Sequence, residues 1–192
     1  MIKALLGPNG AGKSTYLRRL MGLESGAINL EMAMVFQEPL LFDLTVFGNI
    51  SLGLKARHIK DVREKVANWI AIFGISHLKD RRAITLSSGE AQKVSLARAM
   101  AFEPKILLLD EPFANLDFRS QITIKNKIRE IIKENNIDTI WVTHNKSEAL
   151  EVADYIMIMI DGKIVQEGEP KEVVKNPSTK EVALFLDVYN GD

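Results

Sequence analysis

The feature that most constrains the fold of this sequence is a glycine-rich stretch at residues 7–15, which reads GPNGAGKST. It fits the pattern Gly-x-x-x-x-Gly-Lys-Ser of a phosphate-binding loop. Glycine is needed there because the backbone N–H groups must turn toward anionic oxygens with no Cβ in the way. An apolar run at 1–6 and a helical pattern at 15–21 flank it. An ordinary glycine-rich turn is the alternative, and the match at every fixed position argues against it.

The residues of this loop have predicted roles in holding a nucleoside triphosphate. Lys13 would reach the β- and γ-phosphates, and the Ser14 hydroxyl would hold Mg²⁺. The phosphates would sit at the N-terminus of the following helix, where free N–H donors and the helix dipole favour negative charge. The expected nucleotide-binding residues are Asn9, Gly10, Ala11, Gly12, Lys13, Ser14 and Thr15.

Composition narrows the class of protein. The chain has 192 residues, a formal net charge of zero and no cysteine. This length suits one well-packed domain, and the balanced charge gives no reason to expect a nucleic acid partner. The lack of cysteine excludes disulfides, thiolate catalysis and cysteine-based zinc sites. No apolar run approaches the roughly 20 residues of a membrane span. Because the N-terminus leads straight into the loop without a signal peptide, we expect membrane association only through a partner.

Apolar patterns along the chain predict alternating strands and helices. The expected strands cover 1–6, 27–30, 32–36, 106–109, 139–143, 155–160 and 163–167, the last two as a hairpin. The expected helices cover 15–21, 59–73, 91–101, 122–133 and 148–152, with helices or a tail from residue 171. The alternation predicts a mostly parallel central sheet, whose ligands bind at the carboxyl ends of the strands. A helical block at about 45–83 interrupts the pattern.

Two acidic residues follow the apolar run at 106–109, which is typical of a strand covered on both faces. We expect Asp110 to bind Mg²⁺ through water, opposite Ser14. Glu111 would project toward the γ-phosphate and polarise the attacking water. An acidic pair that caps the next helix is the alternative, and the presence of the phosphate loop argues against it.

Gln37 and His144 stand at the ends of two other expected strands. Gln37 could contact Mg²⁺ or the attacking water, and His144 could contact the γ-phosphate. Taken alone, each is weak evidence, because a solvated loop amide and a structural histidine are the ordinary alternatives. Together with the phosphate loop, these residues indicate a Mg²⁺-dependent nucleoside triphosphatase.

The sequence resembles the ATP-binding cassette (ABC) ATPases over essentially its whole length. The resemblance rests on six stretches that follow the order of that family: 7–15, the loop at Gln37, LSSGE at 86–90, 106–111, ANLD at 114–117, and Thr143-His144. The most specific of these is LSSGE with the following AQKVSLARA, because other phosphate-loop enzymes lack it.

The resemblance implies an α/β fold of the P-loop NTPase type in a single ABC ATPase domain over 1–192. This fold has a mostly parallel sheet with helices on both faces, an inserted helical subdomain at about 45–83, and here a reduced antiparallel β-subdomain. Glu111 would be the general base, His144 the switch at the γ-phosphate, and Gln37 a further catalytic and metal contact.

The family further implies a head-to-tail homodimer in the ATP-bound state. Each ATP would lie between the phosphate loop of one subunit and the 86–90 signature of the other, whose helix start offers donors to a γ-phosphate. A simple serine N-cap is the alternative there. The residues implied to bind nucleotide across the dimer are Ser87, Ser88, Gly89, Glu90 and, at the dimer contact, Asp117.

For transporters of this family, the resemblance implies partners in the membrane. The Gln37 loop and the helical block would engage integral membrane permease subunits, which work with a substrate-binding protein. The protein would then be cytoplasmic and peripheral on the inner face of the cell membrane. The apolar residues at 40–42 and 46–47 are candidates for the groove that receives a permease helix, or else belong to the core.

The sequence departs from the family at two places. Its signature has Ser88 and Glu90 where the family usually has glycine and glutamine, and Glu90 brings a carboxylate near phosphate unless it is hydrogen-bonded away. Only six residues precede Gly7, and the stretch from Ser14 to Gln37 is short, so we expect the adenine-stacking aromatic of the family to be missing. Because base stacking contributes about 1–3 kcal/mol, we expect weaker and less base-selective nucleotide binding.

Three functions follow from the resemblance. The first is the ATPase subunit of an importer, and short stretches such as EAQ and VALFL look like those of tungstate/molybdate-type importers. The second is a soluble ABC ATPase that is not tied to transport. The third is an impaired regulatory subunit that only binds nucleotide, and the presence of Glu111 and His144 argues against it.

Overall fold

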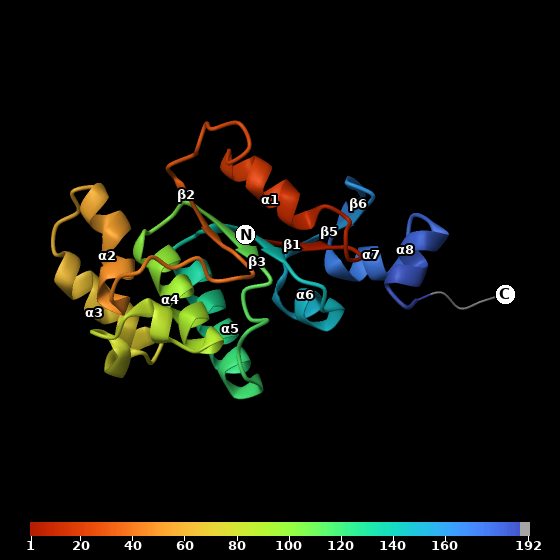
Figure 1. The fold of residues 1–192 in the computed structure, drawn as a ribbon. Coiled ribbons are helices and arrows are strands. Elements are labelled where there is room, and N and C mark those ends of the chain that lie inside the picture. Colours follow the sequence, from red (N-terminus) through yellow and green to blue (C-terminus); the bar gives the residue numbers. More distant parts are fainter. Residues whose placement is uncertain (189–192) are drawn as a thin grey trace.

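The computed structural model describes residues 1–188 and is organised around a six-stranded sheet with the order β2-β3-β4-β1-β5-β6 (Figure 1). The five strands from β2 to β5 in this order are parallel, and β6 pairs antiparallel with β5. The mostly parallel sheet that the sequence predicts is therefore confirmed. The strands are β1 (Ile2–Leu6), β2 (Met32–Val35), β3 (Ile106–Asp110), β4 (Asp138–Val142), β5 (Tyr155–Ile160) and β6 (Lys163–Gly168).

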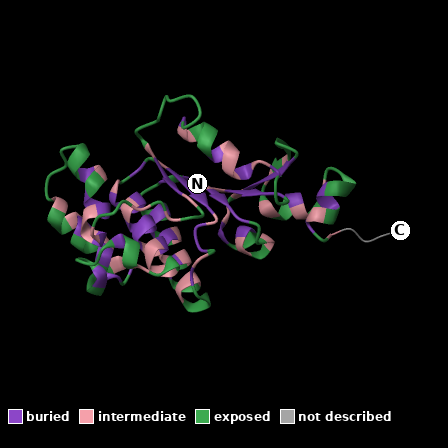
Figure 2. Ribbon diagram, viewed as in Figure 1, coloured by how far each residue is buried: buried purple, intermediate pink, exposed green. Residues whose placement is uncertain are grey.

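Helices cover both faces of the sheet because its central strands are apolar on both faces. In β1, Leu5 packs with Leu17 of α1 on one face, whereas Ala4 and Leu6 pack with α6, α7 and α8 on the other. The buried strands lie between exposed outer helix surfaces in Figure 2. The helices are α1 (Lys13–Met21), α2 (Val46–Ala56), α3 (Val62–Ile72), α4 (Ser88–Ala101), α5 (Phe118–Glu134), α6 (Lys146–Val152), α7 (Pro170–Lys175) and α8 (Lys180–Phe185), with 3-10 turns at Ser76–Leu78 and Ala83–Thr85.

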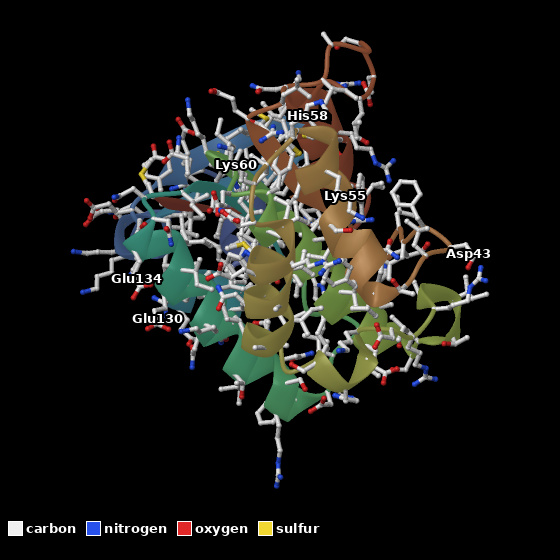
Figure 3. All side chains as sticks on the ribbon, turned by 90° about the vertical axis from the view of Figure 1, so that its left-hand side faces the viewer. Asp43, Lys55, His58, Lys60, Glu130 and Glu134 are labelled. Atoms are coloured by element: carbon white, nitrogen blue, oxygen red, sulfur yellow. The ribbon has the colours of Figure 1, made fainter. Side chains whose placement is uncertain are left out.

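The helical block lies beyond the β2 edge of the sheet, where α2 and α3 pack against α4 (Figure 1). Its two ends are joined by a β-bridge between Thr45 and Arg82 and by the Ala83 N–H, which donates to the Leu44 carbonyl at 2.8 Å. The bounds of 45–83 and the description of this block as a subdomain stay predictions. Figure 3 shows its outer surface, with the exposed charged side chains of Lys55 and Lys60.

The predicted strand at 27–30 is wrong, because this stretch forms no strand. It passes over the surface between α1 and β2, and Ile28 and Leu30 are 50% and 69% exposed. A strand of four residues needs a neighbouring strand to satisfy its backbone, and none pairs with it here. Within residues 1–188, antiparallel pairing between named strands is confined to β5 and β6 at the sheet edge.

The turn residues of the described chain behave as their sequence signals indicate. Gly74 follows α3 with a φ of 66°, in the left-handed region that suits glycine after a helix. Asp161 and Gly162, with φ of 47° and 75°, form the predicted hairpin turn between β5 and β6.

Candidate functional site

The carboxyl ends of four parallel strands meet at a cleft of about 420 Å³ beside the phosphate loop. The loop follows β1, Gln37 follows β2, Asp110 ends β3, and Val142 ends β4. The structure thereby brings together residues that lie more than a hundred positions apart. The cleft is lined by Asn9, Gly10, Gly12, Lys13, Ser14, Thr15, Gln37, Asp110, Glu111 and Val142.

The backbone of the loop explains two of its glycines. A Cβ on Gly7 would lie 2.1 Å from the Met159 carbonyl oxygen, so no larger residue fits there without a shift of β5. Gly12 caps the N-terminus of α1 with a φ of 93°, a conformation that L side chains rarely adopt. Ala11 differs from the other predicted loop residues, because its side chain is buried under the loop and its carbonyl accepts from the Gly162 N–H at 3.0 Å.

Lys13 is buried at the bottom of the loop. Its Nζ donates to the carbonyls of Gly7 and Pro8, at 2.8 and 2.9 Å. Burial lowers the pKa of Lys13, and the nearby carboxylates of Glu111 and Asp110 act in the opposite direction. The ammonium group is therefore held between loop carbonyls and two carboxylates, in a cleft that an anionic ligand can enter.

The residues around Asp110 fit a magnesium ion. Asp110 is 3% exposed, and its Oδ1 has no hydrogen-bond partner in the structure. Burial raises the pKa of Asp110, while a hydrogen bond with the Ser14 side chain lowers it in part. A buried carboxylate oxygen without a partner, beside a hydroxyl and the Gln37 amide in one cleft, provides the oxygen ligands that Mg²⁺ prefers. The roles of Ser14, Gln37 and Asp110 as ligands stay predictions.

Glu111 and His144 form a direct contact. The His144 Nδ1 lies 2.9 Å from the Glu111 Oε2, and the Glu111 side chain is the more buried of the two. Glu111 has a φ of 43°, unusual for a residue with a side chain, and its N–H donates to the Val142 carbonyl at 3.0 Å. The structure thus brings the predicted base and the predicted switch within hydrogen-bonding distance, and their catalytic roles stay predictions.

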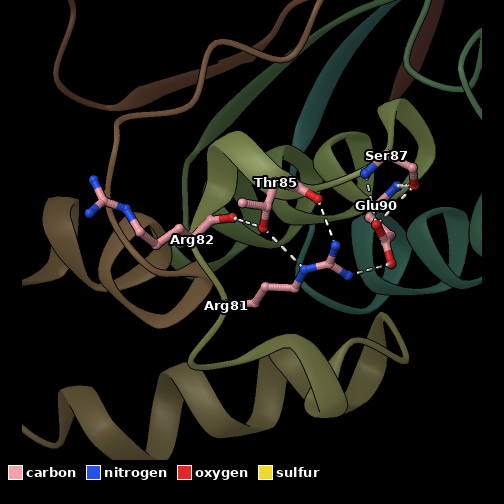
Figure 4. A network of polar contacts seen from close by, with 5 residues as sticks. All are labelled: Arg81, Arg82, Thr85, Ser87 and Glu90. Atoms are coloured by element: carbon pink, nitrogen blue, oxygen red, sulfur yellow. Dashed lines mark hydrogen bonds and ion pairs between the residues drawn. The ribbon is translucent and has the colours of Figure 1, made fainter.

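The signature residues form the start of α4 as a capping box (Figure 4). The Glu90 Oε2 accepts from the Ser87 N–H at 2.8 Å and from the Ser87 hydroxyl at 3.0 Å, and the Glu90 N–H donates to that hydroxyl at 3.3 Å. These bonds, with the Ser87 N–H first and a weaker attraction to Arg81, lower the pKa of Glu90. The carboxylate is therefore hydrogen-bonded within its own helix turn, the condition under which the sequence predicts little cost near phosphate.

The structure does not bring the signature to the cleft of the same chain. None of the described residues that line the cleft belongs to 87–90, and Asp117 lies outside it as well. Asp117 caps α5, where its Oδ1 accepts from the Ser120 N–H at 3.0 Å, and hydrogen bonds from Ser120 lower its pKa. The nucleotide-binding roles of Ser87, Ser88, Gly89, Glu90 and Asp117 therefore stay predictions that depend on a second copy of the chain.

The apolar residues near Gln37 divide between surface and core. Leu40 and Phe42 are 58% and 55% exposed, whereas Val46 is fully buried and Phe47 packs against the core. The exposed pair lies beside Arg98 of α4, whose guanidinium donates to the Leu40 carbonyl at 2.7 Å. Of the two stretches that the sequence offers as a permease groove, the one at 40–42 is thus on the surface.

Two polar residues near the site are not among the predicted site residues. Gln92 is fully buried and donates to the Pro112 carbonyl, directly after Glu111. Glu148 accepts a hydrogen bond from Thr143, directly before His144. A signal was present for Gln92, because it occupies the buried face of α4 at helical spacing from Leu96 and Ala99. No sequence pattern indicated that Thr143 would donate a hydrogen bond to Glu148.

Comparisons with known proteins give consistent results. Residues 1–114 match the family described as ABC transporter. The chain is 42% identical to the sulfate/thiosulfate import ATP-binding protein CysA of Synechococcus elongatus, over 97% of this chain and 60% of that protein. It is 39% identical to the molybdate/tungstate import ATP-binding protein WtpC of Thermococcus kodakarensis, over 97% of this chain and 62% of that protein. The chain thus spans about 60% of the length of these curated relatives.

A solved structure is similar over almost the whole chain. It is cbiO1 from Clostridium perfringens, described as part of the ABC transporter complex cbiONQ. The similarity has a TM-score of 0.76 and 30% sequence identity, and it covers 98% of this chain and 84% of that one. In the part of the present chain that the structure describes, no helix combines the length and the apolar character needed to cross a membrane.

Proposed function

The chain belongs to the ABC transporter family, and from this membership we propose that it is the ATP-binding and ATP-hydrolysing subunit of an importer. The observation that carries the proposal is the cleft at the sheet edge, where Lys13, Ser14, Asp110 and Glu111 lie together beside a glycine loop. We further propose that residues 1–192 form one ABC ATPase domain, with 45–83 as its inserted helical subdomain.

Each cleft residue has a role in this proposal. The N–H groups of the loop and the Lys13 ammonium bind the β- and γ-phosphates. Ser14, Gln37 and Asp110 hold Mg²⁺, which neutralises charge on the phosphates when it is bound. The Glu111 carboxylate accepts a proton from the attacking water, and His144 orients that carboxylate or contacts the γ-phosphate.

The proposal includes a second copy of the chain. The signature at the start of α4 does not line the cleft of its own chain, and the N–H groups of Ser88 and Gly89 would meet the nucleotide of another copy. Gly89 approaches the Asn115 carbonyl so closely that a Cβ would lie 3.1 Å from it. The signature therefore rests on the 114–117 stretch, which would let both elements meet a partner subunit together.

The transport partners are supported by the relatives and by one surface. The relatives are named for import of sulfate/thiosulfate and of molybdate/tungstate. They favour import without selecting one substrate. The exposed Leu40 and Phe42 beside the Gln37 loop provide an apolar contact for a permease subunit. The protein would then act on the cytoplasmic face of the membrane, with a substrate-binding protein on the other side.

The proposed activity is tested by ATP turnover and its dependence on Glu111. The unmodified protein should release phosphate from Mg-ATP. Glu111→Gln should lower the rate by about 10²- to 10⁴-fold, the usual contribution of a general base, while Mg-ATP still binds. The exposed Glu64→Gln on α3 serves as the control, and its rate should match that of the unmodified protein.

Two outcomes would contradict this account. If Glu111→Gln turned over ATP at the unmodified rate, Glu111 would not be the base. If Mg-ATP bound to the unmodified protein without any hydrolysis, an impaired regulatory subunit would be the better description. Recovery of permease subunits in a pull-down from solubilised membranes distinguishes an importer from a soluble ATPase.

A further inference from the structure

The segment 111–117, which joins β3 to α5, is held from two sides by glutamine side chains. Gln92 of α4 donates from its Nε2 to the Pro112 carbonyl at 2.9 Å. Gln121 of α5 donates to two carbonyls further along the segment, each at 3.0 Å. The two side chains hold different parts of the segment: Gln92 holds the carbonyl of the residue directly after Glu111, whereas Gln121 holds carbonyls further toward α5. Of the two helices, α4 is the one that begins at the signature.

Gln92 differs from an ordinary packing residue. Its side chain is fully buried, and its Oε1 has no hydrogen-bond partner among the described residues. An unsatisfied buried carbonyl group is unfavourable, so methionine of similar length would fill the same space without that cost. What methionine would lack is the donor to the Pro112 carbonyl. The hydrogen bond, and not the packing, is therefore the feature that requires glutamine.

The hydrogen bond acts next to the residue whose backbone is strained. Glu111 adopts a φ of 43°, which is unfavourable for a residue with a Cβ and persists only where its surroundings hold it. Three hydrogen bonds hold it here: the Glu111 N–H donates to the Val142 carbonyl at 3.0 Å, the Glu111 carbonyl accepts from the Ala114 N–H at 3.2 Å, and the next carbonyl accepts from Gln92. Loss of the Gln92 bond would remove one of these restraints on the backbone that carries the Glu111 carboxylate.

Gln92 also lies close to the start of the signature helix. It is four residues after Ser88, the first residue of α4, which places it about 6 Å along the helix axis. The same end of α4 contacts the segment a second time, through Gly89 and the Asn115 carbonyl. Asn115 in turn donates to the Gln37 carbonyl at 2.9 Å. The start of α4 thus contacts the backbone that follows Glu111 at two carbonyls, those of Pro112 and Asn115.

We infer that Gln92 is a positioning residue, which couples the start of the signature helix to the orientation of the Glu111 carboxylate through the Pro112 carbonyl. The inference rests on the proposed ATPase function and deepens it. It assigns Gln92 no contact with nucleotide. A nucleotide of the partner subunit at the signature of α4 would, through Gln92, help to set the geometry of the base in the same chain.

Gln92→Met tests the inference, because it keeps the side-chain length and removes the donor. We expect kcat for Mg-ATP to fall by about ten- to a hundredfold, as for a small misplacement of a reacting group. KM and the directly measured affinity for ATP should stay close to those of the unmodified protein, since the phosphate loop is untouched. A merely structural role would instead lower the thermal unfolding midpoint and change kcat and KM together.

Gln121→Met is the matched control. It removes two hydrogen bonds from the same segment, from α5 and not from the signature helix. We expect its kcat to stay close to that of the unmodified protein although its unfolding midpoint falls. Rates are compared per nucleotide-binding site, which corrects for any fraction of either variant that fails to fold.

The inference is overturned if Gln92→Met keeps its kcat, if its kcat and KM change together, or if Gln121→Met loses as much activity. A different result identifies failure of the proposed function: an unmodified protein that binds Mg-ATP and does not hydrolyse it. In that case the inference about Gln92 falls with the function on which it rests.

Discussion

At the scale of the residue, the site and its surroundings contain carboxyl groups whose ionised form is disfavoured by burial. Glu148 is an example beside His144: it accepts a hydrogen bond from Thr143 and lies near Lys125 and Glu151. Burial raises the pKa of Glu148, while the Thr143 hydrogen bond and the Lys125 charge lower it in part. The ionised Glu148 carboxylate therefore destabilises the folded state relative to the unfolded state, so the stability of the protein should depend on pH.

We expect Glu148→Gln to unfold at a higher temperature than the unmodified protein at neutral pH. A carboxyl group whose folded pKa lies above its unfolded pKa contributes most to stability when protonated, and this contribution is lost as the pH rises through the folded pKa. The glutamine Oε1 still accepts from Thr143, so only the charge is removed. Thermal midpoints between pH 3 and pH 8 measure the difference, which should shrink as the pH falls.

The exposed Glu134→Gln on α5 (Figure 3) is the control for this measurement. Its midpoint should follow that of the unmodified protein at every pH. A Glu148→Gln variant that is less stable than the unmodified protein at neutral pH would show that the ionised carboxylate stabilises the fold, against this account.

At the scale of the element, α4 combines a helix cap with the proposed nucleotide contact of the signature. Its first turn is closed by the capping box of Ser87 and Glu90, and its body passes beneath the 111–117 segment. The start of α4 is therefore fixed by local bonds, and the helix contacts the 111–117 segment through Gly89 and Gln92. An effect on stability can be distinguished from an effect on ATP turnover by comparing a variant that lacks the N-cap of α4 with one that lacks the N-cap of α2.

Ser87→Ala should lower the free energy of unfolding by about 1 kcal/mol, the usual effect of losing a serine cap. Thr45→Ala is the matched variant, because Thr45 caps α2 with a 2.9 Å bond from the Gly48 N–H and lies outside the predicted nucleotide site. Chemical denaturation measures both losses, and we expect them to be similar. ATP turnover, measured at a protein concentration high enough for the proposed dimer to form, should fall only in Ser87→Ala. Equal turnover in the two variants would contradict a role for the signature.

The elements that the sequence predicted well are those with a strong local signal. The apolar run at 106–109 became the buried strand β3, and the Asp-Gly pair became the β5–β6 turn. The stretch at 27–30 failed because apolar residues alone do not provide a neighbouring strand. The hydrogen bonds that the side-chain amides of Gln92 and Asn115 donate could not be predicted from the sequence, because they join residues 20 and 78 positions apart in the chain.

At the scale of the whole molecule, the strand order explains why the cleft lies at the carboxyl ends of the parallel strands. The chain passes from β1 to β2 at the far edge and returns through β3 and β4 to lie beside β1. The carboxyl ends of these strands then present the phosphate loop, Gln37, Asp110 and His144 at one edge, as expected for open α/β sheets. The order of strands was not visible in the sequence, whereas the motifs that it brings together were.

The same arrangement keeps the proposed signature out of the cleft of its own chain. The cleft contains the phosphate loop and the two acidic residues, while the signature at 87–90 lies outside it. The central claim is therefore that two copies of the chain close over Mg-ATP, each supplying the signature for the nucleotide of the other. This claim concerns association and not chemistry, so it is best tested where hydrolysis is slow.

Sedimentation velocity of Glu111→Gln with millimolar Mg-ATP is the most direct measurement of this claim. The account predicts a monomer without nucleotide and a dimer with Mg-ATP, because the uncleaved γ-phosphate bridges the two subunits. The same variant carrying Ser88→Glu, which places a carboxylate at the shared phosphate, should stay monomeric. A Glu111→Gln protein that binds Mg-ATP and remains a monomer would contradict the account.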